Sequence, residues 1–496
     1  MVTGRRIDNS RKWLVLAVLV LGTFMAILDT SIVNIAIPKM MAVFGVGTEQ
    51  IQWVLTAYML TMGAIIPLTG YLSDRFGSKK VYIWALIAFT LGSAFCGLAW
   101  SNPSMVVARV IQALGGGMIM PVSMSILYQV IPQQERGLAL GIWGIAAMAA
   151  PAIGPTLSGY IVEHLDWRLI FTINIPVGIV AVIFSFILLP EIPRRPVGKF
   201  DYLGVLFASV GLVSILYVLG EGASIDWNDI KNIFLLIFGG FFLLLFTVNE
   251  LTHSDPLLDL RVLKIGPFTL SIVIASITNI ALFGGIFLLP LFLQNLRGYT
   301  AMQTGIIMFP SAVATGLMMP IGGKLLDRLG PKPVVIPGLA ILALATYELA
   351  HLSMETPQTT ITWLLVLRGL GLGLAMMPAS TAGMNAVPLP LVARASALSN
   401  VVRQVAGSLG ITILTTFMQR RQALHYSELA ARVTEFNGQE LYLYWLYGSV
   451  QKEALITAIN DTLALTAVIS CVALFFAFWL KKGQTPAGKE QVIISE

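Results

Sequence analysis

Two ionisable residues lie deep within long apolar stretches of the sequence. Asp29 lies in the stretch 13–37 and Arg109 in the stretch 104–129. On insertion scales, a charged side chain at the centre of a membrane-spanning helix costs about 2.5–3.5 kcal/mol, so such residues usually have a function. An acid at this depth is a candidate proton carrier. Since an arginine does not lose its own proton, we expect Arg109 to modulate Asp29.

Further polar residues share helical faces with one another. Arg109 and Gln112 are about one turn apart, and the same spacing relates Asn400 to Arg403 and Gln404. We expect both faces to line a central cavity. Other candidates for the cavity wall are Asn34, Trp53, Tyr58, Met148, Asn279 and Phe283. The alternative for Asp29 is a structural contact within its own helix, to Asn34 or to a backbone group.

The composition shows what surrounds these residues. The chain has 496 residues, of which 56% are hydrophobic and 11% are charged. A soluble domain is about 25% charged, so much of this protein must face lipid. The net charge of +6 comes from basic residues scattered between apolar stretches rather than from one patch, and this pattern argues against a nucleic-acid partner.

Fourteen apolar stretches are long enough to cross a bilayer as helices, which takes roughly 20 residues. The sequence therefore predicts an all-α membrane protein with 14 transmembrane helices. The spans are 13–37, 51–73, 80–100, 104–129, 136–162, 168–190, 202–220, 231–251, 267–293, 302–326, 333–352, 360–386, 394–418 and 459–480.

Basic residues predict the orientation of these spans. If the N-terminus is cytoplasmic, most Lys and Arg of the connecting loops lie on the cytoplasmic side, as the positive-inside rule requires. We therefore expect a multi-pass protein of the inner membrane with both termini in the cytoplasm.

One loop on the outer side is unusually long and covers residues 419–458. It carries the aromatic string LYLYWLY at 441–447. Tyr and Trp favour the headgroup region of a bilayer, so an interfacial helical segment is the first interpretation. A lateral gate for lipid-like substrates is the alternative.

An internal repeat divides the chain. The segment GYLSDRFGSKK at 70–80 recurs as GKLLDRLGPK at 323–332, and Arg109 is echoed by Arg368. Equivalent positions in two six-helix bundles would be six helices apart, whereas here eight helices separate them. Two helices are therefore inserted between the bundles. Parallel halves of this kind describe the major facilitator fold. We expect 1–200 to form the N-terminal bundle, 201–260 the two inserted helices and a linker, and 261–496 the C-terminal bundle, with the inserted helices at the periphery.

Three segments carry a resemblance to a known family. The segment 70–80 resembles the loop motif of the major facilitator superfamily. The segments LGTFMAILDTSIVNIAIP at 21–38 and DWRLIFTINIPVG at 166–178 resemble its fourteen-helix drug:proton antiporter branch, that of EmrB/QacA-type multidrug exporters. The resemblance covers nearly the whole chain.

The resemblance implies a cytoplasmic gate at the loop motif. Asp74 is expected to face the start of the thirteenth span, near Arg394 to Ser396, and Arg75 to reach Glu135. Gly70 and Gly77 would allow close approach and a tight turn, and Lys79 and Lys80 would anchor the cytoplasmic face.

The fifth span resembles the antiporter motif of exporters in this superfamily. Its residues Gly141, Gly154, Pro155 and Gly159 combine proline bends with close glycine packing, which suits a seam between the bundles. Ala150 and Ser158 stand where the motif usually has glycine.

The remaining motifs exclude other activities. Outside the spans there is no nucleophile–base set, no metal-ligand cluster and no Walker-type loop, and Cys96 and Cys471 lie in apolar stretches. We therefore expect no enzyme, no metal and no cofactor other than a proton gradient.

The function that follows is proton-coupled export of small amphipathic or lipophilic compounds by alternating access, that is, multidrug efflux. The runner-up is a flippase or exporter of lysophospholipid, fatty acid or another lipid-like metabolite. A channel or a transporter-like sensor is the alternative from a different class. The sequence does not say whether a periplasmic adaptor protein takes part.

Overall fold

The computed structural model describes residues 9–192, 200–220, 229–253, 256–433 and 440–481, which form helices and no strand. Each predicted span coincides with one helix or with two helices joined at a bend. Among the described residues, twelve helices are long and apolar enough to cross a membrane, and the pair α2 and α3, bent by 55°, would make thirteen. The helices are α1 (Asn9–Phe44), α2 (Thr48–Ile65), α3 (Leu68–Phe76), α4 (Ser78–Gly97), α5 (Asn102–Val130), α6 (Arg136–His164), α7 (Leu169–Thr172), α8 (Asn174–Leu188), α9 (Tyr202–Gly220), α10 (Ile230–Thr252), α11 (Gly266–Leu291), α12 (Ala301–Leu329), α13 (Lys332–Glu348), α14 (Gln358–Met384), α15 (Val392–Val433) and α16 (Glu440–Ala477).

Local sequence explains several helix ends. The side chain of Ser101 caps α5 and exchanges hydrogen bonds with Ser104 in a capping box. Gly77 separates α3 from α4 with a φ of +90°, a conformation that side chains rarely adopt. Pro121 lies inside α5, where neighbouring helices in a membrane can compensate for the lost backbone hydrogen bond.

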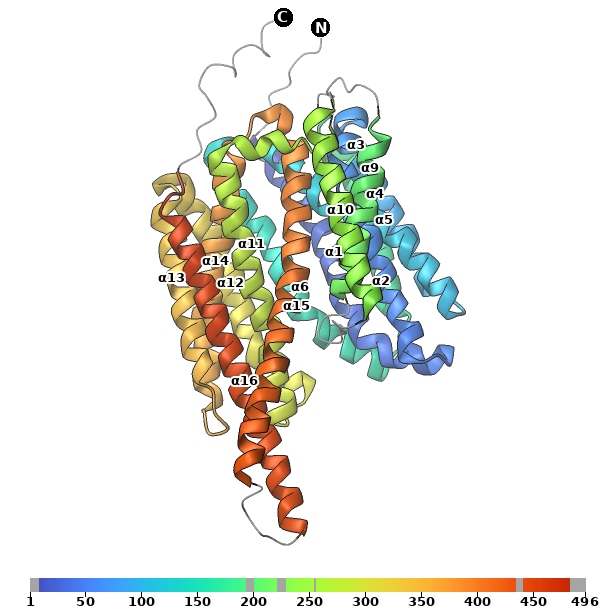
Figure 1. The fold of residues 1–496 in the computed structure, drawn as a ribbon. Coiled ribbons are helices and arrows are strands. Elements are labelled where there is room, and N and C mark those ends of the chain that lie inside the picture. Colours follow the sequence, from blue (N-terminus) through green and yellow to red (C-terminus); the bar gives the residue numbers. More distant parts are fainter. Residues whose placement is uncertain (1–8, 193–199, 221–228, 254–255, 434–439, 482–496) are drawn as a thin grey trace, which may run out of the picture.

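The helices form two bundles that lie side by side. Helices α1 to α8 make one bundle and α11 to α16 the other (Figure 1). The first described helix begins, and the last one ends, at the same end of the molecule, which we call the terminal end. The predicted all-α membrane fold of two six-helix bundles with two inserted helices is thus confirmed.

The two inserted helices occupy different positions. Helix α10 packs on α9 and exposes a row of large apolar side chains, among them Phe234 and Leu244. Helix α9 contacts both bundles: a Cβ at Gly63 of α2 would lie 2.6 Å from Leu216, and the hydroxyl of Thr412 of α15 donates to the Leu219 carbonyl at 3.2 Å. The expectation that both inserted helices are peripheral is therefore wrong for α9.

The segment 419–458 is largely helix rather than loop. Helices α15 and α16 continue through it and extend beyond the rest of the bundle, away from the terminal end (Figure 1). Asp461 accepts from Arg421 at 2.6 Å and lies 2.8 Å from His425 Nε2, and these contacts join the two helices. The aromatic side chains of 441–447 lie outside the described residues.

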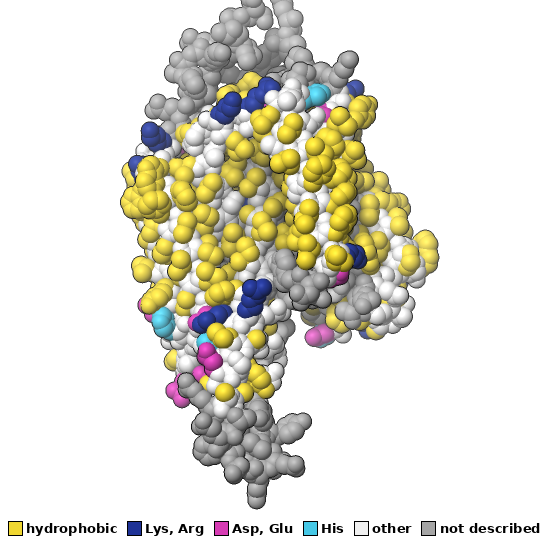
Figure 2. All heavy atoms as spheres, in the orientation of Figure 1, with side chains coloured by type: hydrophobic (Ala, Val, Ile, Leu, Met, Phe, Trp, Pro, Cys, Tyr) yellow, Lys and Arg dark blue, Asp and Glu magenta, His cyan; other side chains and the backbone are white. Residues whose placement is uncertain are grey.

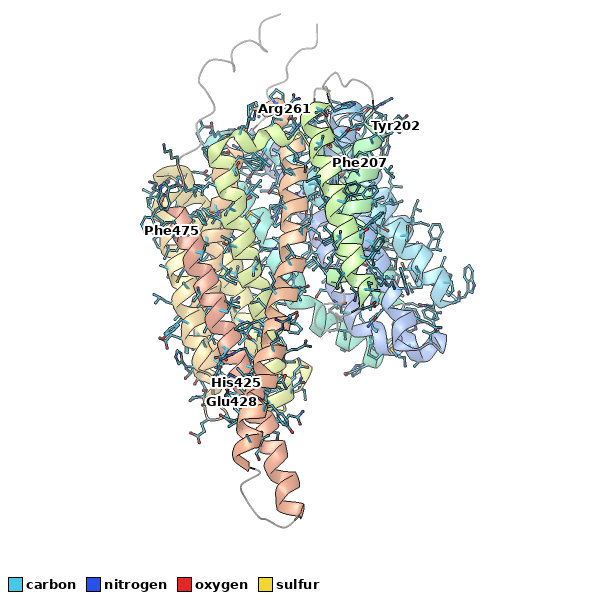
Figure 3. The ribbon with its side chains drawn as sticks, viewed as in Figure 1. Tyr202, Phe207, Arg261, His425, Glu428 and Phe475 are labelled. Carbon is cyan, nitrogen blue, oxygen red and sulfur yellow. The ribbon has the colours of Figure 1, made fainter. Side chains whose placement is uncertain are left out.

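The molecular surface shows the belt expected of a membrane protein. Hydrophobic side chains cover the middle of the face in Figure 2, whereas Lys and Arg gather at the terminal end and further charged groups lie toward the opposite end. Figure 3 shows the same division, with Arg261 and Tyr202 near the terminal end and His425 with Glu428 near the other. This pattern matches a lipid-facing belt between two aqueous sides.

Candidate functional site

Asp29 lies at the centre of a buried cluster of polar side chains. Its carboxylate forms an ion pair with Arg109 of α5, with Nη1 2.6 Å from Oδ2. It also accepts from Gln112 Nε2 at 2.8 Å and from Asn174 Nδ2 at 2.9 Å. The side chain of Asp29 is fully buried and that of Arg109 is 1% exposed. The sequence-predicted pair is thus brought together in space.

Neighbouring helices hold the partners of Asp29 in place. Gln112 accepts from Arg109 at 2.6 Å and donates to Ser93 of α4 at 2.8 Å. The guanidinium of Arg109 donates to the Val54 carbonyl of α2 at 3.3 Å, and it lies 3.9 Å from the ring centre of Tyr58. Five helices, α1, α2, α4, α5 and α8, therefore meet at one charge pair.

This geometry has a clear electrostatic consequence. A buried carboxylate and guanidinium neutralise each other, and the additional hydrogen bonds satisfy their remaining donors and acceptors. Removing the charge from Asp29, as a proton would, leaves Arg109 without its counter-ion. The packing of several helices therefore depends on this one charge pair.

Two members of the cluster were not predicted. Asn174 lies within the segment 166–178 that carried the family resemblance, but nothing in that pattern paired it with Asp29. Ser93 has no distinguishing mark in the sequence. Asn34 is not a partner of Asp29: its side chain donates to the Thr30 carbonyl at 3.3 Å.

The loop motif joins the two bundles at the terminal end. The carboxylate of Asp74 in α3 accepts from Arg394 Nε of α15 at 2.9 Å, and both side chains are buried. A Cβ at Gly70 would lie 3.0 Å from the Arg394 Cα, so glycine permits this approach. The structure places Asp74 where the resemblance implied.

The predicted contact between Arg75 and Glu135 is absent. Arg75 donates to the Tyr71 hydroxyl of its own helix at 2.8 Å, and Glu135 forms an ion pair with Lys12 of α1 at 2.5 Å. Arg75 points away because the turn of α3 that directs Asp74 toward α15 leaves the next residue exposed. Two basic residues follow in the loop: Lys79 lies 3.7 Å from Glu191, and Lys80 is exposed.

The second copy of the loop motif also bridges the bundles. Asp327 of α12 accepts hydrogen bonds from the backbone N–H groups of Gly137 at 3.0 Å and Leu138 at 3.1 Å, in the first turn of α6. A carboxylate is favoured at this position by the helix dipole. Nearby, Arg136 donates to Asn385 of α14 at 3.2 Å. The sequence showed the repeat, but not that its second acid also bridges the bundles.

The antiporter-motif glycines divide between two interfaces. A Cβ at Gly141 would overlap the Met319 carbonyl of α12, so Gly141 lies in the seam between the bundles. A Cβ at Gly154 would overlap Ser31 of α1, within the same bundle, and Gly159 has open space beside it. Of these three glycines, only Gly141 lies in the expected seam. The side chain of Pro155 lies outside the described residues.

Some of the predicted cavity residues lie together on α11 and α15. Asn279 donates to the Arg403 carbonyl at 3.0 Å. The guanidinium of Arg403 donates to Asn400 at 2.9 Å and contacts the sulfur of Met124, from α5, at 3.5 Å. A Cβ at Gly407 would lie 2.8 Å from the Phe283 ring.

Other predicted cavity residues lie elsewhere. The Trp53 ring is 6.2 Å from that of Tyr217 in α9, and Gln404 lies at the junction where α2, α9 and α15 meet. Met148 packs against a buried apolar cluster that includes residues of both bundles. Tyr58 is buried against Arg109 and belongs to the Asp29 cluster. No group of His, Cys, Asp and Glu suited to a metal occurs in the described part of the chain.

Two membrane-embedded bundles, joined at one end by repeated acidic motifs, define the architecture of a secondary transporter. The chain belongs to the Major Facilitator Superfamily, whose family model matches residues 19–411. It is 40% identical over 444 residues to the uncharacterized MFS-type transporter YhcA of Bacillus subtilis (strain 168), covering 90% of this chain and 84% of that one. It is 30% identical over 480 residues to the multidrug export protein EmrB of Escherichia coli (strain K12), covering 93% and 94%.

The fold has solved counterparts as well. The proton:xylose symporter XylE matches with a TM-score of 0.65 at 14% sequence identity, over 97% of this chain and 98% of that one. These matches confirm the predicted fold and the resemblance to EmrB-type multidrug exporters.

Proposed function

We propose that this protein exports small amphipathic or lipophilic compounds across the inner membrane in exchange for protons, with both termini in the cytoplasm. The observation that chiefly supports the proposal is the buried pair of Asp29 and Arg109, which joins five helices and can change its charge. Similarity to a multidrug export protein along nearly the whole chain supports the substrate class.

Asp29 carries the proton in this proposal. Its ionised form is held by Arg109, Gln112 and Asn174, and protonation removes the charge that these donors stabilise. Arg109 keeps its own proton and remains as a buried cation. Because Asn174 lies on α8 and Arg109 on α5, the release of both loosens the packing of these helices on α1.

The acids Asp74 and Asp327 act as latches of the cytoplasmic gate. Hydrogen bonds join the two bundles near the terminal end at Asp74, Arg136, Asp327 and Ser396. Asn400 and Arg403 of α15 add contacts to the sulfur of Met124 in α5. With the termini in the cytoplasm, this arrangement corresponds to a transporter closed toward the inside. Opening inward requires both acids to release the other bundle.

Inverted membrane vesicles test the proposed function. An imposed pH gradient, acid inside, should drive saturable uptake of at least one compound from a panel of amphipathic drugs. Each addition should release protons from the lumen, and a protonophore should abolish both effects. Ion conductance without saturation would indicate a channel, and binding without accumulation would indicate a sensor. Either result would contradict the proposal.

The lipid-flippase alternative has no specific support in the described residues. It was suggested by the aromatic string at 441–447, whose side chains lie outside them. Lysophospholipids and fatty acids nevertheless belong in the substrate panel, because they are amphipathic compounds too.

A further inference from the structure

The C-terminal bundle contains a buried arginine at the position equivalent to Arg109. Arg368 lies in α14, is 4% exposed, and is the counterpart of Arg109 in the internal repeat. Within the described residues, no carboxylate forms an ion pair with it. Its Nη2 donates to the backbone carbonyls of Ala281 and Leu282 in α11, and its Nε has no hydrogen-bond partner.

The position that would hold a counter-acid is occupied by glycine. A Cβ added at Gly285 of α11 would overlap the guanidinium of Arg368. The separation in sequence between Asp29 and Gly285 is larger than that between the two loop acids, Asp74 and Asp327. It is smaller than that between the two arginines, Arg109 and Arg368. Gly285 therefore lies in the stretch of α11 that corresponds to Asp29 in α1, and Arg368 occupies the space that a side chain at Gly285 would need.

The two bundles consequently differ in charge at equivalent depth. In the N-terminal bundle Asp29 neutralises Arg109, whereas Arg368 has only carbonyl oxygens as partners. Backbone carbonyls within a helix already accept hydrogen bonds, so they compensate a cation weakly. Arg403 of the same bundle has Asn400 and Met124 as its side-chain partners, which are also uncharged. A buried cation with unused donors is best satisfied by a group that brings its own negative charge.

We propose that Arg368 binds an anionic group of the transported compound, so that the preferred substrates are amphipathic acids such as carboxylates. The planar guanidinium can donate two parallel hydrogen bonds to the two oxygens of one carboxylate. Carbonyl oxygens along a helix cannot accept such a parallel pair. This inference deepens the proposed export function and rests on it. In this proposal Asp29 of the N-terminal bundle carries the proton, and Arg368 of the C-terminal bundle binds the charged group of the substrate.

Equilibrium binding tests this assignment without any proton gradient. The purified protein in lipid nanodiscs is incubated with radiolabelled octanoate, and octanamide and an octyl ammonium compound serve as competitors of the same chain length. Empty nanodiscs supply the background. The wild-type protein should bind octanoate about tenfold or more tightly than octanamide, since hydrogen bonds to a charged group contribute more than neutral ones.

Variants then show which residue causes the preference for octanoate over octanamide. Arg368→Gln should bring the affinity for octanoate to that for octanamide, and Arg368→Lys should retain part of the difference. Lys264→Gln removes an exposed cation and should change neither affinity. A structural role alone would lower thermal stability in Arg368→Gln while preserving the tenfold preference. If Arg368→Gln does not fold, Arg368→Lys must still weaken octanoate binding without affecting octanamide.

Three outcomes overturn the proposal. They are equal wild-type affinities for octanoate and octanamide, an undiminished preference in the Arg368 variants, and displacement of octanoate by chloride as effectively as by an organic acid. The last result would assign Arg368 to an inorganic anion. Failure of proton-driven uptake in vesicles would contradict antiport but would leave this binding preference intact, so the two proposals are tested separately.

Discussion

The carboxylate of Asp29 depends on its partners because it has no access to solvent. Arg109, Gln112 and Asn174 supply its hydrogen bonds from two other helices, α5 and α8. Removing one partner of a buried ion pair leaves an uncompensated charge, which is far more costly than removing both. The pair therefore predicts a particular pattern of stabilities among single and double variants.

Arg109→Gln should destabilise the protein by about 3–5 kcal/mol, because it leaves the charge of Asp29 buried without its counter-ion. The double variant Asp29→Asn with Arg109→Gln should recover most of this loss. Thermal unfolding in detergent, followed by tryptophan fluorescence, measures both. A double variant as unstable as the sum of the two single variants would show that the residues are not coupled.

Sequence alone identified Asp29 and Arg109 because a charge inside an apolar stretch is conspicuous. It did not identify Asn174 or Ser93, since neutral polar residues occur in many helices without a special role. It also paired Arg75 with Glu135 wrongly. The direction in which a side chain leaves a short helix such as α3 depends on the 55° bend before it. Pro67 marks the position of that bend but does not specify its direction.

At the scale of the elements, the two copies of the loop motif bridge the bundles with different chemistry. Asp74 binds the side chain of Arg394, whereas Asp327 binds backbone N–H groups at the start of α6. The first contact is a buried ion pair, and the second relies on the N-terminal end of a helix. The loss of either acid should loosen the contact between the bundles at the terminal end. The loss of Asp74 should have the larger effect, because its partner is a buried cation.

The closed end can be probed with a cysteine at a buried position in the seam. Ser396→Cys is introduced into a chain whose Cys96 and Cys471 are replaced by serine. Ser396 is fully buried, so a membrane-impermeant maleimide should label the cysteine slowly. Adding Asp74→Asn should accelerate labelling about tenfold or more, in line with the loss of a charge-assisted hydrogen bond.

The control for this experiment is Lys80→Gln, which changes an exposed charge in the same loop. It should leave the labelling rate unchanged. Asp327→Asn should have an intermediate effect. If labelling in Asp74→Asn is as slow as in the parent chain, Asp74 is not a latch.

At the scale of the whole molecule, α9 connects bundles that must move relative to each other. It packs on Gly63 of α2 through Leu216 and on Thr412 of α15 through Leu219. The repeat predicted two inserted helices, because eight helices separate equivalent motifs. Their placement could not be predicted, since both helices are apolar all round and neither carries a charge near its centre that would favour one neighbour.

This position of α9 predicts how cross-links will affect transport. Joining α9 to α2, through Gly63→Cys and Leu216→Cys, should be tolerated, because α9 can still slide on α15. Joining α9 to α15, through Leu219→Cys and Thr412→Cys, should be tolerated for the same reason. Both links together, made with a short bismaleimide, should stop transport. Transport by the doubly linked protein at the rate of the unlinked one would show that the bundles do not move about α9.

The central claim is that Asp29 couples proton movement to export. Asp29→Asn preserves the size of the side chain and removes only its titration. In inverted vesicles, this variant should lose accumulation driven by a pH gradient while it still exchanges substrate down a concentration gradient. Substrate accumulation in Asp29→Asn that matches the wild type under the same pH gradient would contradict the account and would place the coupling residue elsewhere.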